Sequence, residues 1–247
     1  MNRRFFIDPL LDITSPVRLS GSDANHIKNV LRLGPGSPII LFDGKGGEYE
    51  GRIESLSSDN VRVSVSAPIM SATESQTDIT IAQGFLKDKK MDLLIRQLTE
   101  LGITRWVPFF AERSVSRPNP KRLTARKARW EKIARESLKQ CRRTKMPEIT
   151  DTMKFDSMLE TGKIADIRLI FWENNMGENQ SPFRKERKKK TASIFAVIGP
   201  EGGFSSTEVR KANAMGFETA PLGPRILRAE TAAIVAAALL QHFFGDL

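Results

Sequence analysis

The sequence predicts an α/β protein in which a small β-rich part precedes a larger part built on a mostly parallel sheet. Short strand-like runs joined by glycine turns fill residues 1–70, a pattern typical of a small barrel. From Asp78 onwards, short apolar runs alternate with amphipathic helical segments, which favours parallel strands covered by helices. Between the two parts, Pro68–Thr77 is polar and has no periodicity. We therefore expect two domains, residues 1–70 and residues 75–247.

In the first part, three strands and one helix are predicted. Asn60–Ser66 alternates apolar and polar residues strictly, as a half-buried strand does. Glu48–Ile53 has the same character and follows a glycine turn after the apolar run Pro38–Phe42. A helix is expected over Asp23–Leu31, with Asp23 or the serine before it as N-cap and Gly34 just past its end.

The second part begins with a strand candidate, Ile79–Phe85, and a helical stripe over Met91–Leu101 that ends at Gly102. The remaining expected strands are Ile103–Phe110, Ile167–Trp172 and Ile194–Ile198. The remaining expected helices run over Leu123–Cys141, from Ser205 to Gly216, and from Ala229 onwards. This alternation predicts that neighbouring strands run parallel.

Composition and charge exclude several classes of protein. With Cys141 as the single cysteine, no intramolecular disulfide can form, and with only His26 and His242 besides it we expect no metal site. The N-terminus lacks the apolar core of a signal peptide, and the run Ile234–Leu240 is too short to span a bilayer. We expect a cytoplasmic protein with no membrane partner. The formal net charge of +10 favours a nucleic-acid partner, although a basic enzyme without one stays open.

A glycine-rich turn, Gly199–Gly203, separates an apolar run from the next helix. Its glycines let the backbone approach a ligand closely. Ser205 and Glu208 have the spacing of a capping box, which places a helix start directly after the turn. Because no Lys-Ser or Lys-Thr pair follows the glycines, the turn is not a P-loop. Taken alone, it is consistent with a ligand cradle or with a plain structural turn.

A second turn, Leu222–Pro224, precedes a segment in which Arg225 and Arg228 flank two apolar residues. Arginine can grip a phosphate or carboxylate with two hydrogen bonds, although both side chains could instead neutralise neighbouring groups. The helix after Ala229 is apolar on most sides, which indicates either a core helix or a subunit interface. Two glycine-bearing turns, each between a strand and a helix, predict a ligand lying across the strand ends.

Cationic residues are dense between Lys121 and Lys145, where only Glu131 and Glu136 oppose them. A surface that follows the phosphates of an RNA is the preferred interpretation, and a solvated helix face is the alternative. The polar segment Glu173–Ser193 is expected to be a surface loop that either contacts RNA or aids solubility.

Two motifs are highly specific: IGPEGGF at Ile198–Phe204 and LGPRILRAETA at Leu222–Ala232. Weaker matches lie at Arg4-Phe5-Phe6, at His26 before Val30-Leu31-Arg32, and at Thr99–Gly102. With these motifs the sequence resembles the ribosomal RNA small-subunit methyltransferase E family along nearly its whole length.

The resemblance implies a PUA-like β-barrel followed by a SPOUT methyltransferase domain with a deep trefoil knot. It implies a homodimer that uses S-adenosylmethionine to methylate N3 of a uridine in 16S ribosomal RNA of the small subunit. The implied cofactor-binding residues are Phe171, Trp172, Glu173, Ile198, Gly199, Pro200, Glu201, Gly202, Gly203, Leu222, Gly223, Ile226 and Leu227. The expected RNA-binding residues are Arg3, Arg4, Arg32, Arg113, Arg126, Arg135, Arg142 and Arg143.

Methylation at N3 calls for a proton acceptor and for a group that stabilises negative charge. Charged residues of the two turns are the candidates for both roles. Since uracil N3 carries a weakly acidic proton, Glu201 or Glu230 is the candidate proton acceptor, and each could instead pair with a helix N-terminus. Arg225 or Arg228 is the candidate that stabilises negative charge on the uracil oxygens. No metal is required. A non-catalytic RNA-binding assembly factor and a SPOUT methyltransferase acting on another RNA stay open as alternatives, whereas the absence of lysine after Gly203 disfavours nucleotide hydrolysis.

Overall fold

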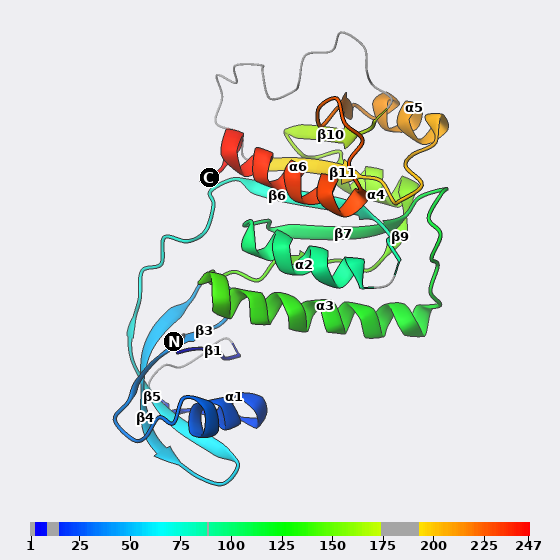
Figure 1. The fold of residues 1–247 in the computed structure, drawn as a ribbon. Helices are drawn as coiled ribbons and strands as arrows, with labels where there is room; N and C mark the ends of the chain where they lie inside the picture. The colour runs from blue at the N-terminus through cyan, green and yellow to red at the C-terminus, as the bar shows by residue number, and fades with distance from the viewer. Residues whose placement is uncertain (1–2, 9–14, 88, 174–192) are drawn as a thin grey trace. The chain divides into compact units, whose positions relative to one another are not determined.

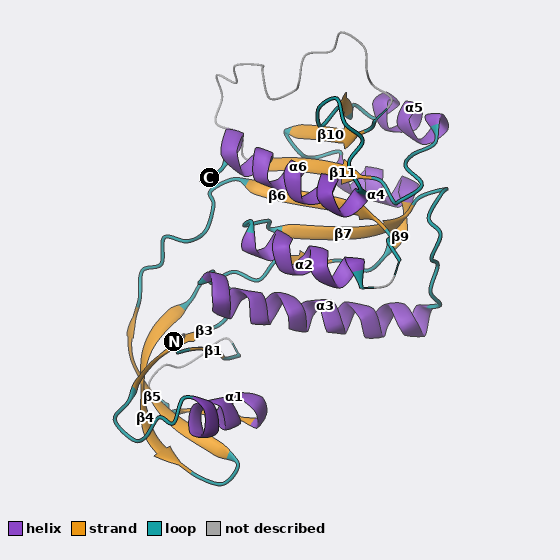
Figure 2. Ribbon diagram, viewed as in Figure 1, coloured by secondary structure: helices purple, strands orange, loops and turns teal. Residues whose placement is uncertain are grey.

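The computed structural model describes residues 3–8, 15–87, 89–173 and 193–247 (Figure 1, Figure 2). The chain divides into two compact units. Unit 1 comprises Met1–Glu74 and Arg135–Met146, and unit 2 comprises Ser75–Ala134 and Pro147–Leu247. Residues 135–146, which the sequence pattern placed in the second part, therefore belong to the first. The predicted loop over Glu173–Ser193 lies outside the described residues except for its two ends.

Unit 1 is built on a curled five-stranded sheet in the order β1-β3-β4-β5-β2. Its strands are β1 (Arg4–Phe6), β2 (Val17–Ser20), β3 (Pro38–Phe42), β4 (Glu48–Leu56) and β5 (Asn60–Pro68). β1 runs parallel to β3, and the other pairs are antiparallel. Alternate residues such as Leu41, Ile53 and Val63 point into one apolar core. The predicted β-rich unit is confirmed as this half-barrel.

The helix predicted over Asp23–Leu31 differs from the structure in its start and in its type. The helix α1 (Gly21–Asn25) begins earlier, after Ser20, because Gly21 adopts a φ of +60° that turns the chain directly out of β2. The following turn η1 (His26–Val30) is π-helical, and Leu31 donates its N–H to the carbonyl of His26 at 2.9 Å. This wider turn brings Ile27 into the core.

Buried ion pairs fasten residues 135–146 within unit 1. Arg4 forms an ion pair with Glu48 and donates from Nη2 to the carbonyl of Arg143 at 3.0 Å. Arg143 in turn pairs with Glu74 at 2.9 Å. Both arginines are at least nine-tenths buried. Charges removed from water need such partners, so unit 1 depends on this late segment of the chain.

Unit 2 is built on a seven-stranded sheet in the order β12-β10-β11-β6-β7-β8, with β9 also paired to β7. Its strands are β6 (Asp78–Gly84), β7 (Arg105–Phe110), β8 (Glu148–Ile149), β9 (Met153–Lys154), β10 (Ile167–Phe171), β11 (Ser193–Ile198) and β12 (Glu218–Ala220). Every pair of these strands is parallel. The central strand β6 is buried along nearly its whole length, as parallel strands covered on both faces are. The predicted α/β class is confirmed.

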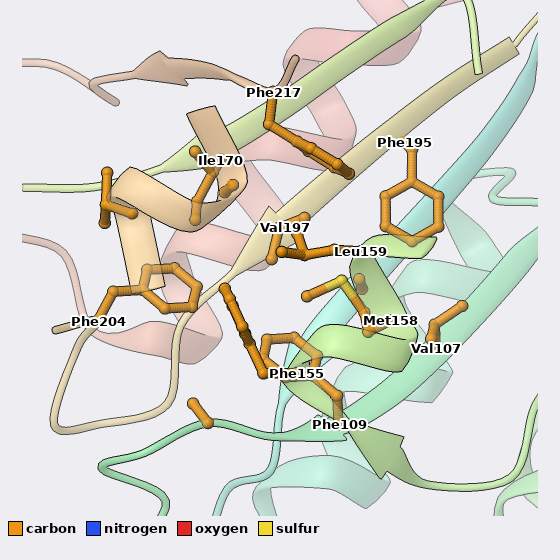
Figure 3. Packing of buried hydrophobic residues seen from close by; sticks show 14 residues of the cluster. Val107, Phe109, Phe155, Met158, Leu159, Ile170, Phe195, Val197, Phe204 and Phe217 are labelled. Atoms are coloured by element: carbon orange, nitrogen blue, oxygen red, sulfur yellow. The ribbon is translucent and has the colours of Figure 1, made fainter. Parts of the chain in front are cut away.

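The helices of this part of the chain are α2 (Lys90–Glu100), α3 (Pro120–Cys141), α4 (Phe155–Gly162), α5 (Ser206–Ala214) and α6 (Ala229–Phe244). The last turns of α3 belong to unit 1. A large apolar cluster packs α4 and α5 against the sheet, with Phe109, Phe155, Val197 and Phe204 close together (Figure 3). α6 packs on β6 and β11. This packing fixes the strand ends from which the site is formed.

Candidate functional site

Three strands of unit 2 end at the same level of the sheet. Phe171, the last residue of β10, lies in register with Ile198 of β11 on one side and with Ala220 of β12 on the other. Because the strands are parallel, the segments that follow them leave from one edge. The three loops predicted to hold a ligand, residues 171–173, 199–203 and 222–227, therefore lie together.

The turn Gly199–Gly203 is held by close contacts with the end of β6. Gln83 donates from Nε2 to the carbonyl of Gly199 at 3.1 Å. A Cβ atom at Gly84 would lie 2.5 Å from the backbone nitrogen of Pro200, so a side chain there would push the turn away. Gly203 closes the turn with a φ of +66° and an N–H bond to the Pro200 carbonyl at 2.9 Å.

The predicted capping box anchors the exit of this turn. Ser205 accepts a hydrogen bond at Oγ from the Glu208 N–H at 3.3 Å, and Glu208 accepts one at Oε2 from the Ser205 N–H at 3.0 Å. Glu112 joins the box, since it accepts from Ser205 Oγ at 2.7 Å and donates its N–H to Glu208 at 2.8 Å. Phe204 is buried in the core and lies parallel to Phe109. The turn is thus fixed at both ends.

The three loops enclose a cavity of about 450 Å³, within the size range of small-molecule sites. Its wall includes every residue expected to bind the cofactor except Gly202: Phe171, Trp172, Glu173, Ile198, Gly199, Pro200, Glu201, Gly203, Leu222, Gly223, Ile226 and Leu227. It also includes the four candidate catalytic residues Arg225, Arg228, Glu201 and Glu230, together with Lys90. The structure therefore brings the two glycine turns and their charged neighbours around one cavity.

Gly202 does not line the cavity, contrary to expectation. A Cβ atom at this position would lie 3.0 Å from Cβ of Arg113 and 3.1 Å from its carbonyl oxygen. Arg113 donates from Nη1 to the Gly202 carbonyl at 3.3 Å. The absence of a side chain at Gly202 thus allows the turn to pack against the chain that follows β7.

Lys90 connects two charged residues of the cavity wall. Its Nζ lies 3.2 Å from Oε1 of Glu201 and 3.3 Å from Oε2 of Glu230. Partial burial lowers the pKa of Lys90, but hydrogen bonds and charge from both glutamates outweigh this effect and raise that pKa above its usual value. Lys90 could not be predicted from the sequence, because a lysine at a helix start forms no motif and its partners lie in distant segments.

Glu201 is held more firmly than a glutamate with a single partner. Its Oε1 also accepts the N–H of Lys87 at 3.2 Å. Burial raises the pKa of Glu201, yet hydrogen bonds from its own N–H and that of Lys87, together with the ammonium of Lys90, outweigh burial and lower that pKa. The Glu201 carboxylate is therefore held in its charged form.

One polar atom of the cavity wall, Nε1 of Trp172, is shielded from solvent and has no hydrogen-bond partner among the described residues. Oε2 of Glu230 is also shielded from solvent, and it faces the ammonium of Lys90 at 3.3 Å. Buried polar atoms in proteins are nearly always hydrogen-bonded. Nε1 of Trp172 therefore marks a place where a ligand can complete the wall.

The arginines expected to bind RNA differ in their surroundings. Arg4 and Arg143 are buried, and their charges are paired with Glu48 and Glu74 within unit 1. Arg126 and Arg135 lie over the rings of Phe85 and Phe6, at 5.4 and 4.2 Å from the ring centres. The exposed members are Arg3, Arg32, Arg113, Arg135 and Arg142.

The described part of the chain contains neither a candidate metal site nor a candidate membrane span. No group of three or more histidine, cysteine, aspartate or glutamate side chains there is arranged to hold a metal ion. No helix in it combines the length and the apolar character that crossing a membrane requires.

Two family models and several known proteins are similar to this chain over most of its length. Residues 73–241 match the family model of an RNA methyltransferase domain, and residues 19–66 match that of an RNA methyltransferase PUA domain. The chain is 30% identical over 246 residues to Ribosomal RNA small subunit methyltransferase E of Bacillus subtilis, covering 97% of this chain and 96% of that relative. It is 31% identical to the protein of that name from Rickettsia conorii, covering 96% and 94%.

One solved structure is similar to this chain along its whole length. The Ribosomal RNA small subunit methyltransferase E of Neisseria gonorrhoeae, bound to S-adenosyl methionine, superposes with a TM-score of 0.88. Its sequence is 29% identical, and the match covers 100% of both chains.

Proposed function

This chain belongs to the ribosomal RNA small subunit methyltransferase E family, and from that membership we propose that it transfers a methyl group from S-adenosylmethionine to N3 of a uridine in 16S ribosomal RNA. The observation that carries the proposal is the cavity, since three loops from aligned strand ends and both specific motifs form its wall. The proposed setting is the cytoplasm, where small ribosomal subunits are assembled.

The wall of the cavity fits S-adenosylmethionine. Phe171, Ile198 and Leu227 offer apolar surface for an adenine ring, and the backbone of Gly199–Gly203 offers N–H and C=O groups to its edge. The unpartnered Nε1 of Trp172 adds a hydrogen-bond donor. When bound, S-adenosylmethionine supplies a methyl group on a positively charged sulfur, ready for displacement by a nucleophile.

The charged residues of the cavity wall are proposed to remove the proton from uracil N3 and to stabilise negative charge on its oxygens. We assign proton removal from uracil N3 to Glu230, because it lines the cavity and Lys90 is the one ion-pair partner it has among the described residues. Glu201 is the weaker acceptor, since its pKa is lowered by the groups that hold it. Arg225 and Arg228 are exposed on the wall and are placed to stabilise negative charge on the uracil oxygens.

The RNA is proposed to bind exposed cationic residues, namely Arg3, Arg32, Arg113, Arg135 and Arg142. A homodimer and a knot are also proposed. The dimer is supported by exposed apolar side chains of unit 2, including Ile226 and Phe243. The knot is supported by the strand order, since β12 adds to the far side of β10 before α6 returns to β6.

The test is transfer of labelled methyl from S-adenosylmethionine to small ribosomal subunits that lack the modification, followed by mass mapping of the nucleotide. Methylation of a uridine at N3 is the expected result. RNA binding without turnover would favour a non-catalytic assembly factor. Turnover on transfer RNA but not on small subunits would favour a related enzyme with another substrate.

A further inference from the structure

We propose that Lys90 is a positioning residue of the methyl transfer, holding Glu201 and Glu230 on one ammonium group and thereby fixing the glycine turn relative to the start of α6. This inference rests on the proposed function. Neither the glycine motifs nor the arginine segment contains Lys90, which lies at the first position of α2.

The three side chains originate in three separate segments of unit 2. Glu201 lies in the turn after β11, Glu230 lies in the first turn of α6, and Lys90 is the first residue of α2. The two glutamates belong to the two segments that carry the specific motifs. Among the described contacts between these segments and α2, one atom, Nζ of Lys90, forms an ion pair with each segment. It lies 3.2 Å from Glu201 and 3.3 Å from Glu230.

Lys90 balances the negative charge of two carboxylates at this end of the cavity. Each carboxylate has an oxygen within 3.3 Å of the same nitrogen, so removal of the ammonium leaves two negative charges facing each other. All three side chains are partly shielded from water, which strengthens their interaction. Without Lys90 we expect the two segments to move apart.

The two glutamates differ in how many groups hold them. Glu201 has a second anchor, the N–H of Lys87, and so remains in place when the ammonium is lost. For Glu230, the ion pair with Lys90 is the only ionic contact among the described residues, and no hydrogen bond from another described group holds its Oε2. Lys90 therefore matters most for the orientation of Glu230, the proposed proton acceptor.

The experiment compares Lys90→Met, Lys90→Arg and the matched control Lys89→Met in methyl transfer to unmodified small subunits. Lys89 is the exposed neighbouring lysine and does not line the cavity. We expect Lys90→Met to lower kcat about tenfold or more with a smaller change in KM for S-adenosylmethionine. Lys90→Arg should restore kcat to within about threefold of wild type, because it returns the charge, and Lys89→Met should match wild type.

A double-variant measurement separates positioning from general loss of structure. If Lys90 acts through Glu230, then Lys90→Met combined with Glu230→Gln lowers kcat hardly further than the more damaging single change. Effects that multiply would overturn the proposal. Thermal unfolding is recorded for each protein, and Lys90→Gln takes the place of Lys90→Met if the latter does not fold.

The controls also distinguish this inference from the function on which it rests. An active wild type with an equally active Lys90→Met variant overturns the role of Lys90 alone. A folded wild type that transfers no methyl to any RNA overturns both.

Discussion

Replacing Gly84 by alanine tests whether the glycine turn of the site is placed by direct contact with β6. Gly84 does not have a positive φ, so its backbone conformation accepts alanine. The obstacle is space: the added Cβ would lie 2.5 Å from the nitrogen and 2.7 Å from Cδ of Pro200, and 2.8 Å from the carbonyl carbon of Gly199. Ordinary contact starts near 3.4 Å, so the turn must move by almost 1 Å.

The size of the effect follows from that displacement. Overpacking of this kind costs about 1–3 kcal/mol. The loss of chain entropy in the unfolded state offsets about 0.4–1 kcal/mol of this cost, which leaves a net destabilisation of at most about 2.6 kcal/mol. A shift of about 1 Å at a reactive site costs about a hundredfold in rate. We therefore expect Gly84→Ala to lose far more activity than stability.

The assay pairs calorimetric titration with S-adenosylmethionine and methyl transfer to unmodified small subunits. The matched control is Gly34→Ala, since a Cβ there meets no heavy atom of the described residues within 4 Å. The control should behave as wild type, and Gly84→Ala should bind weakly and turn over slowly while remaining folded. Wild-type affinity and turnover in Gly84→Ala would refute the reasoning.

Three further predictions concern the same unit. Arg228→Ala should lower kcat by about 10²–10³ while calorimetry finds cofactor affinity nearly unchanged, and equal losses would move this residue from catalysis to binding. Ser205→Ala removes the N-cap of α5 and the hydrogen bond to Glu112, so the free energy of unfolding should fall by about 1–2 kcal/mol. Denaturant titration measures this change, and an unchanged midpoint would contradict the capping argument. The pKa of Glu201 is lowered in the folded protein, so its stabilisation is present above the usual value of 4.5 and is lost as the pH falls below it. The Tm difference between wild type and Glu201→Gln should shrink over that range, and a difference independent of pH would show that the carboxylate charge is not involved.

The features that could be predicted from the sequence depend on residues close together in the chain. The capping box of Ser205 and Glu208 spans three positions, and the structure contains both of its hydrogen bonds. The helix stop at Gly102 depends on a φ of +79°, which the sequence pattern already indicated. The start of α3 was placed too late, although Asn119 followed by Pro120 is a recognisable cap and first-turn pair.

The features that could not be predicted depend on contacts between distant segments. Lys90 joins the site through partners in two loops far along the chain, and no local pattern indicates such an ion pair. Charge alone could not distinguish the exposed Arg142 from Arg143, its neighbour, which is buried against Glu74. The short strand β12, with three residues, has too few positions to show a period. Its pairing with β10 nevertheless places the second glycine turn beside the first.

The membership of residues 135–146 in unit 1 has a consequence for how the chain folds as it is synthesised. A ribosome completes the first 74 residues long before it reaches Arg143, at a rate of about 5–20 residues per second. During that interval Glu74 and Arg4 both lack their contact with Arg143. The N-terminal half-barrel therefore reaches its final form only after more than half of the polypeptide has emerged, and a gene fragment that stops at the linker encodes an unfinished domain.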